Sequence, residues 1–262
     1  MKIITSLIKS YPTQHWLDSK GNRTLKPLAS VELVPLWERG VDNICNSLGS
    51  HSKIILVNKS LKEMSLNVNY VELKHSYDID KKVRTKYPYT KLVCIPEPDS
   101  KGEISDLIQC LNDDVSDKES IFYFRYDRIL EWNPKNFEVT LNDPKYTGGV
   151  IITAPNGDDS DVYVSVDEDD SVYKTNTNKE GSAVVAIYFS SVKKLREAVE
   201  IMRKEGDTSE NIESIIDYMD GLFEVYETNA VHKLDTPEKI LNFTELEIWK
   251  DPTERFNRFR EF

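Results

Sequence analysis

The feature of this sequence that most constrains its fold is the alternation of apolar runs and amphipathic segments in its first half. The segments 34–48 and 103–113 carry apolar residues at helical spacing. Short apolar runs, typical of strands buried on both faces, occur at residues 2–8, 53–57, 91–96 and 120–124. After the second run we expect a short helix capped by Ser60 and then a strand at 68–73. Strands that alternate with helices in this way form a doubly wound, mostly parallel sheet, so we predict an α/β fold.

The second half of the chain changes in character, because predicted strands there follow one another through turns and loops. Further strands are expected at 148–153, 161–166, 183–190 and 222–228, and helices at 191–206, at 210–221 and from Thr236 onward. The sequence contains no internal repeat and no low-complexity linker. We therefore predict one α/β domain over residues 1–245, followed by a charged, aromatic tail over residues 246–262.

Composition narrows the functional classes. The 262 residues carry a net charge of −11, which disfavours non-specific binding to nucleic acid, because such binding draws on lysine and arginine contacts to phosphate. No apolar run approaches the roughly 18 residues of a membrane span, and the N-terminus resembles a buried strand more than a signal peptide. We predict a cytoplasmic protein without membrane contact. The cysteines and histidines lack the spacing of a zinc site.

One basic cluster stands out from this acidic background. Residues 81–91 read KKVRTKYPYTK. The segment is either the solvated end of a helix or a surface that contacts a phosphorylated or polymeric acceptor.

The first candidate for chemistry is Asp127, which follows the apolar run at 120–124. Ligands of doubly wound sheets bind beyond the carboxyl ends of the strands. A carboxylate at such an end can hold Mg²⁺ against phosphate oxygens. The alternative is a structural role, in which Arg125 or Arg128 forms an ion pair with Asp127.

Lys26 and Asp235 are weaker candidates. Lys26 can neutralise charge on a transferring phosphoryl group, or it is an exposed loop lysine. Asp235 precedes Thr-Pro-Glu and is also well placed as a helix cap. The aspartates between residues 158 and 170 lack the spacing of a calcium loop, and we interpret them as two solvated hairpin loops.

Four segments, in order along the chain, resemble the sugar-phosphate nucleotidyltransferase family, whose members have a nucleotide-diphospho-sugar transferase (GT-A-like) fold. They are LKPLASVELVPLWERGVDNI at 25–44, IFYFRYDRILEWNPKNF at 121–137, GGVIITAP with the strands that follow at 148–190, and FEVYETNAVHKLDTPEKILNF at 223–243. The resemblance implies that Lys26 contacts nucleotide phosphates, that Asp127 holds Mg²⁺ (or Mn²⁺), and that Asp235 is a second metal ligand.

The sequence departs from the family pattern at three places, one of which is the closing motif, where Asp-Thr-Pro at 235–237 lacks the family's glycine. The family's glycine-rich loop after the first strand is absent, so Lys9, His15 or Arg23 would have to help bind a triphosphate. The family's Glu-Lys pair at the sugar phosphate would fall near Thr175 and Asn176, where neither residue matches. Lys174 or Lys179 would then contact the sugar phosphate.

Three functional hypotheses follow from this resemblance. The first is a nucleotidyltransferase that joins a nucleotide to a sugar phosphate. The second is a glycosyltransferase that moves a sugar from a nucleotide-diphospho-sugar to an acceptor, a reaction that needs no triphosphate cradle. The third is a non-catalytic relative that acts as a binding subunit. An oligomer of identical chains is compatible with all three.

Overall fold

The structure is a computed structural model. It describes residues 1–6, 16–17, 23–24, 30–31, 34–48, 53–60, 81, 85–88, 91–96, 102–111, 115–155, 157, 161–166, 172–176 and 181–245. Lys9, His15, Lys26 and Lys179 lie outside these residues, and so does the tail at 246–262. The boundary of the predicted domain at residue 245 therefore remains a prediction.

A mixed sheet forms the centre of the described part of the chain, and nine strands belong to it. Seven of them lie in the order β12 (Val172–Asn176), β11 (Tyr163–Val166), β13 (Ser182–Phe189), β8 (Ile121–Phe124), β1 (Lys2–Ser6), β6 (Lys53–Ser60) and β7 (Lys91–Pro96). The remaining two are β10 (Gly149–Ala154), which pairs with β13, and β14 (Phe223–Glu227), which pairs with β10.

The first strand lies at the centre of the parallel part of the sheet. β1 pairs in parallel with β6 on one side and with β8 on the other, so that Ile4 lies beside both Ile55 and Tyr123. β13 then joins β8 in antiparallel orientation. The predicted doubly wound α/β fold is thus confirmed, and its later strands add an antiparallel wing.

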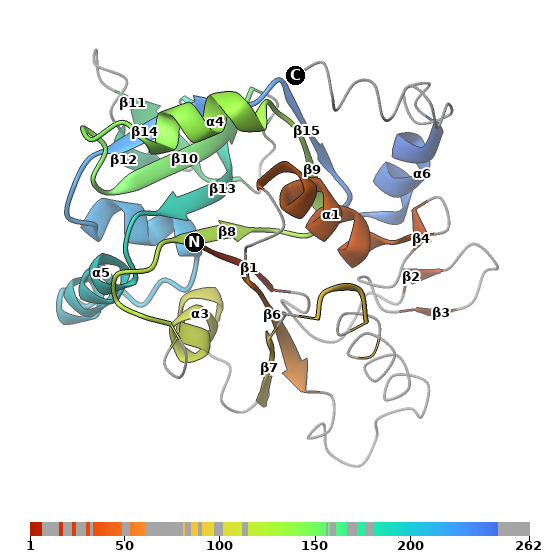
Figure 1. Cartoon of the computed structure of the whole chain (residues 1–262), viewed down its shortest axis with the longest axis horizontal. Coiled ribbons are helices and arrows are strands. Elements are labelled where there is room, and N and C mark those ends of the chain that lie inside the picture. The colour runs from red at the N-terminus through yellow and green to blue at the C-terminus, as the bar shows by residue number, and fades with distance from the viewer. Residues whose placement is uncertain are drawn as a thin grey trace.

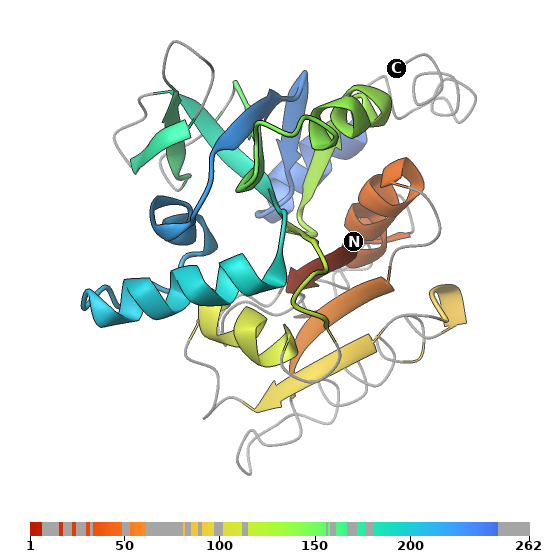
Figure 2. The ribbon, with the colours of Figure 1, turned by 60° about the vertical axis from the view of Figure 1, so that its left-hand side comes forward.

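Helices cover both faces of this sheet (Figure 1 and Figure 2). On one face lie α3 (Glu103–Leu111), α5 (Val192–Lys204) and the 3₁₀ helix η4 (Ile212–Tyr218). On the other face lie α1 (Leu36–Leu48), α4 (Pro134–Leu141) and α6 (Pro237–Glu245). Successive side chains of a strand point to opposite faces, so Ile3 packs with α1 while Ile4 packs with α3.

Small two-stranded ribbons lie outside the main sheet. β9 (Arg128–Glu131) follows β8 after three residues and pairs antiparallel with β15 (Ala230–Lys233), which leads into α6 (Figure 1). Two shorter pairs join β2 (Trp16–Leu17) to β3 (Arg23–Thr24) and β4 (Ser30–Val31) to β5 (Val34–Pro35).

The structure differs from the sequence-based expectation at three elements. Helix α4 was not predicted, although Asn133 caps it by accepting hydrogen bonds from the Lys135 and Asn136 N–H groups and Pro134 begins it. The helix expected at 210–221 is the shorter 3₁₀ helix η4. Ser60, expected to cap a helix, is the last residue of β6. The helix and strand expected beyond Ser60 lie outside the described residues.

Among the helices that the structure describes, none has the length and the apolar character that crossing a membrane would require.

Candidate functional site

The candidate site lies at the carboxyl edge of the parallel strands. β1 ends at Ser6 and its neighbour β8 ends at Phe124, and the next three residues form the turn Arg125–Tyr126–Asp127. This edge is where doubly wound sheets bind their ligands. Asp127 is partly exposed there, whereas Tyr126 and Arg128 on either side of it are buried.

The structure brings the two candidate metal ligands onto neighbouring segments. The ribbon of β9 and β15 pairs Arg128 with Lys233, and one further hydrogen bond extends it, from the Leu234 N–H to the Asp127 carbonyl oxygen at 2.7 Å. Asp235 is the next residue along the chain. Asp127 and Asp235, from distant parts of the sequence, therefore lie on adjoining backbone segments at the end of one ribbon.

This pair of carboxylates fits a divalent cation in number and chemistry. Mg²⁺ at phosphate-transfer sites is usually bound by one or two carboxylates, while water and substrate phosphates complete its coordination. Among the described residues, no group of three or more His, Cys, Asp or Glu side chains could hold a metal by itself. A cation at Asp127 and Asp235 would therefore depend on oxygens of the substrate.

The structure separates Asp235 from the capping role that its sequence context suggested. The cap of α6 is Thr236, whose hydroxyl accepts a hydrogen bond from the Lys239 N–H at 3.2 Å. The carboxylate of Asp235 lies 2.8 Å from the Lys239 ammonium group. The Lys239 and Asp235 side chains are 42% and 34% exposed, so this ion pair is open to solvent.

Arg125 anchors the residues before Asp127 to one face of the sheet. Its guanidinium group lies 3.3 Å from a Glu103 carboxylate oxygen on α3 and 2.8 Å from a Glu213 oxygen on η4. The Tyr123 hydroxyl donates a hydrogen bond to Glu103. Burial lowers the pKa of Arg125, but the two carboxylates outweigh it and raise the pKa above its ordinary value. Arg125 therefore pairs with these glutamates, not with Asp127 as the sequence suggested.

Arg128 anchors the residues after Asp127 to the antiparallel wing. Its guanidinium group donates to the Val184 carbonyl oxygen and to Asp161, each at 2.9 Å. Lys233, directly opposite Arg128 in the ribbon, also pairs with Asp161. The sequence-based interpretation of Asp161 as part of a solvated loop is wrong, because only 3% of the residue is exposed.

Helix α1 anchors the turn from the opposite side. A methyl group at Gly40 would lie 2.0 Å from the Tyr126 carbonyl oxygen, so the helix can approach the turn only because this residue is glycine. One turn further, the Asn43 side chain donates to the Leu130 carbonyl oxygen at 3.0 Å and accepts from the Leu130 N–H at 2.9 Å. Burial, and then the charge of Asp127, raises the pKa of Tyr126.

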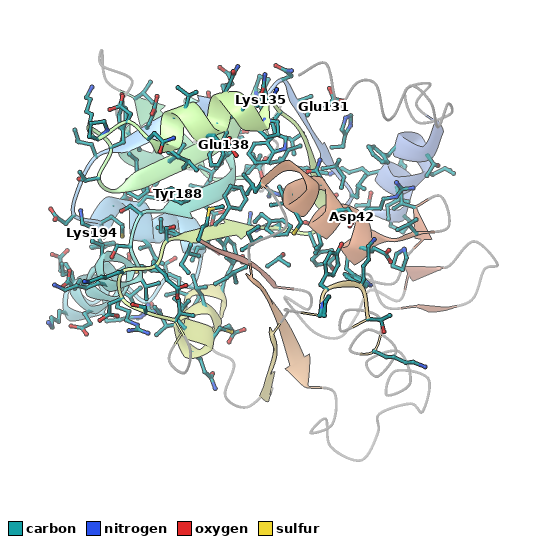
Figure 3. All side chains as sticks on the ribbon, in the orientation of Figure 1. Asp42, Glu131, Lys135, Glu138, Tyr188 and Lys194 are labelled. Carbon is teal, nitrogen blue, oxygen red and sulfur yellow. The ribbon has the colours of Figure 1, made fainter. Side chains whose placement is uncertain are left out.

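The basic cluster at 81–91 makes contacts within the protein. Lys86 pairs with Glu38 and, at 2.7 Å, with Asp42, both on α1 (Figure 3). Tyr87 donates a hydrogen bond to Asp42 and packs edge-on against Trp37. Lys81, Thr85 and Lys86 are helical and exposed, in agreement with the solvated end of a helix, and Lys86 and Tyr87 also hold this segment against α1.

The proposed sugar side of the site lies along β12. Lys174 is on this strand, and the next residue, Thr175, donates hydrogen bonds to Asp217 from its N–H at 3.0 Å and from its hydroxyl at 2.5 Å. The resemblance predicted that the family's Glu-Lys pair would fall near Thr175 and Asn176. In this protein, Thr175 is bound to η4.

Sequence reasoning missed the supporting roles of three residues, namely Glu103, Asp161 and Glu213. Each is buried and holds an arginine next to Asp127. The arginines were noticed because they adjoin Asp127, but their partners lie far away in the sequence, and no local pattern marks them.

Comparison with known proteins was informative only at the level of structure. No protein-family profile and no curated protein sequence matches this chain. Among solved structures, a nucleoside-diphosphate-sugar pyrophosphorylase from Vibrio cholerae RC9 matches with a TM-score of 0.68 and 10% identity, over 93% of this chain and 100% of that chain. A putative glucose-1-phosphate thymidylyltransferase from Bacillus anthracis matches with a TM-score of 0.64 and 14% identity, over 95% of both chains.

A third match is HddC from Yersinia pseudotuberculosis, with a TM-score of 0.61 and 15% identity over 94% of this chain and 99% of that chain. HddC has also been solved in complex with GMP-PN. At these identities the likeness concerns the fold. It confirms that the chain has the fold of sugar nucleotidyltransferases over nearly its whole length, as the four resembling segments predicted.

Proposed function

We propose that this protein is a metal-dependent nucleotidyltransferase that acts on a nucleoside triphosphate and a sugar phosphate. The observation that carries the proposal is the arrangement of Asp127 and Asp235 on paired segments at the carboxyl edge of β8. The same fold in nucleotidyltransferase structures supports it. The rigid support on both sides of Asp127 is what a site for phosphoryl chemistry needs, because that chemistry depends mainly on positioning and charge.

The reaction would be an in-line displacement at the α-phosphorus of the triphosphate. A phosphate oxygen of the sugar phosphate forms the new bond to this phosphorus, and the bond to the bridging oxygen of the β-phosphate breaks. The products are a nucleotide-diphospho-sugar and pyrophosphate. No proton acceptor of unusual pKa is needed, because the attacking phosphate oxygen is already ionised near neutral pH.

Each candidate residue has a role in this scheme. Asp127 and Asp235 would hold Mg²⁺ or Mn²⁺, which supplies positive charge to the phosphate oxygens. Lys9, Arg23 and Lys26 would bind the nucleotide phosphates. Lys174, which is on β12, or Lys179 would bind the sugar phosphate. A cytoplasmic location would supply both substrates.

The test combines binding with turnover. Unfolding temperature is measured with each common NTP and with nucleotide sugars, with and without Mg²⁺, and pyrophosphate release is measured with glucose 1-phosphate and mannose 1-phosphate. A ligand at 100 times its Kd stabilises the fold by about 2.7 kcal/mol. We expect a Mg²⁺-dependent shift with one NTP and pyrophosphate release with that NTP.

Two variants make the test specific to the site. Asp127→Asn and Asp235→Asn should each abolish the Mg²⁺-dependent part of the shift, while Asp220→Asn, whose side chain is 92% exposed, should behave like the wild type. If a nucleotide sugar raises the unfolding temperature and none of the NTPs does, the glycosyltransferase hypothesis is favoured. If no nucleotide changes the unfolding temperature, both enzyme hypotheses are contradicted and the binding-subunit hypothesis is favoured.

A further inference from the structure

The short helix η4 contacts both sides of the proposed site. Glu213, near its beginning, pairs with Arg125 at 2.8 Å, and Asp217, near its end, accepts two hydrogen bonds from Thr175 on β12. We propose that η4 is a strut that fixes the position of β12 relative to the turn that carries Asp127, and that Glu213 and Asp217 are positioning residues. This inference rests on the proposed function.

At one end of η4, Glu213 holds the turn that carries Asp127, the proposed metal ligand. The side chain of Glu213 is 3% exposed, and that of Arg125 is 17% exposed, so their ion pair is shielded from water. A shielded pair holds its geometry more firmly than an exposed one, because little solvent screens its attraction. Arg125 is two residues before Asp127 in the same turn. A shift of Glu213 would therefore move the backbone that presents Asp127.

At the other end of η4, Asp217 holds β12, the strand that carries the proposed sugar-phosphate ligand Lys174. β12 is the last strand of the sheet on its side, so within the described sheet it pairs with β11 alone. Both oxygens of Asp217 are used, one for the N–H and one for the hydroxyl of Thr175. This two-point contact supports a strand that has a sheet neighbour on only one side. Lys174, the candidate ligand for the sugar phosphate, is the residue next to Thr175.

Along its length, η4 is firmly packed. Ile212 and Ile215 are 1% and 0% exposed and belong to the same apolar cluster as the inner face of α5. The Tyr218 hydroxyl donates to Asp207 at 3.0 Å, and the Ser209 and Ser214 hydroxyls lie 2.9 Å apart. A close-packed element of this kind moves as one body, so a displacement at one end is transmitted to the other.

The strut predicts effects at a distance, which hydrogen exchange can measure in the ligand-free protein. We expect Asp217→Asn to speed amide exchange in the peptide containing residues 123–127, which Asp217 does not contact, as well as in β12. We expect Glu213→Gln to speed exchange in β12 as well as in the turn. Mutational coupling through a contiguous network corresponds to a change of about two- to thirtyfold.

Controls separate this effect from general loosening. Asp220→Asn changes an exposed carboxylate two residues beyond η4 and should leave both peptides unchanged. Thr175→Val removes one donor to Asp217 without touching a buried charge, and it should also speed exchange at residues 123–127. If each variant alters only the peptide that it contacts, or if all variants speed exchange throughout the protein, the strut is contradicted.

Kinetics then test the positioning role. With the NTP and sugar phosphate identified above, Asp217→Asn should raise the KM for the sugar phosphate more than it lowers kcat, and Glu213→Gln should lower kcat more than it raises either KM. If the two variants change kcat and the KM for the sugar phosphate to the same extent, the separate roles of Glu213 and Asp217 are contradicted. If the wild-type protein turns over no substrate pair, the proposed function fails, while the exchange experiment still decides whether η4 couples the two segments.

Discussion

At the scale of single residues, the environment of Asp127 is set by its neighbours. Arg125 points to carboxylates on α3 and η4, Arg128 points to Asp161, and Tyr126 lies against Gly40 of α1. The turn is therefore held from three directions. Asp127 is partly exposed at the edge of the sheet, between the buried residues Tyr126 and Arg128.

Asp161→Asn tests the most buried of these contacts. The change removes a negative charge that Arg128 and Lys233 share, and their side chains are only 9% and 8% exposed. Breaking a buried ion pair typically costs about 3–5 kcal/mol, and we expect a loss of stability in this range. Urea unfolding gives the value. The exposed control Asp220→Asn should lie within about 0.5 kcal/mol of the wild type, and an equal effect of both changes would contradict the assigned role of Asp161.

Gly40→Ala tests the close approach of α1. Alanine usually stabilises a helix relative to glycine by about 1 kcal/mol. Here its methyl group would lie 2.0 Å from the Tyr126 carbonyl oxygen, which is backbone and cannot turn away. We expect a net loss of about 1–3 kcal/mol, measured by thermal or urea unfolding. Glu138→Ala, at an exposed position of α4 (Figure 3), should have little effect, and a stabilised Gly40→Ala would refute the contact.

At the scale of elements, one side chain joins helix α1 to the ribbon of β9 and β15. Asn43 bonds to both backbone groups of Leu130, as a neighbouring strand would. Asn43 thereby supplies hydrogen-bond partners along the edge of β9 that does not pair with β15. Since β9 begins directly after Asp127, this contact also fixes where the ribbon leaves the sheet.

Asn43→Ala should weaken this junction. It leaves the N–H and carbonyl groups of Leu130, a residue that is 2% exposed, without their side-chain partner. An unsatisfied buried group costs about 1–3 kcal/mol, and we expect a loss of that size together with faster amide exchange at Leu130. Asn136→Ala, on the exposed surface of α4, is the matched control. Unchanged exchange at Leu130 would show that Asn43 is dispensable.

At the scale of the whole molecule, buried tyrosines make the fold sensitive to alkaline pH. Burial is the main cause that raises the pKa of Tyr123 and Tyr126 well above the ordinary value of 10.0. Both groups stay protonated in the folded protein, whereas in the unfolded chain they ionise near pH 10. Stability is therefore unaffected by these groups below pH 10 and falls as the pH rises above it.

The expected slope can be measured. Each such tyrosine contributes a loss of about 1.4 kcal/mol per pH unit above pH 10, so these two together contribute about 2.8 kcal/mol per unit. Denaturant unfolding at a series of pH values from 8 to about 11.5 gives this slope. Tyr126→Phe should reduce it by about 1.4 kcal/mol per unit, and an unchanged slope in this variant would contradict the assignment.

Local sequence patterns determined the class of the fold and its parallel half. The apolar runs predicted as strands at 2–8, 53–57, 91–96 and 120–124 each overlap a strand of the structure, and such consecutive apolar residues are typical of strands in parallel sheets. The order of the resembling segments also predicted the fold shared with nucleotidyltransferases. Asp127 was recognised for a local reason, since it follows a buried strand.

Only the tertiary structure decided what surrounds that aspartate. Asp161, Glu103 and Glu213 resemble surface residues in the sequence, and they are buried because each meets an arginine from a distant segment. Gly40 and Asn43 gained their roles from the approach of α1 to the turn and to β9. Pairing across a fold depends on how elements pack, and a carboxylate in a loop carries no local sign of the cation that it will meet.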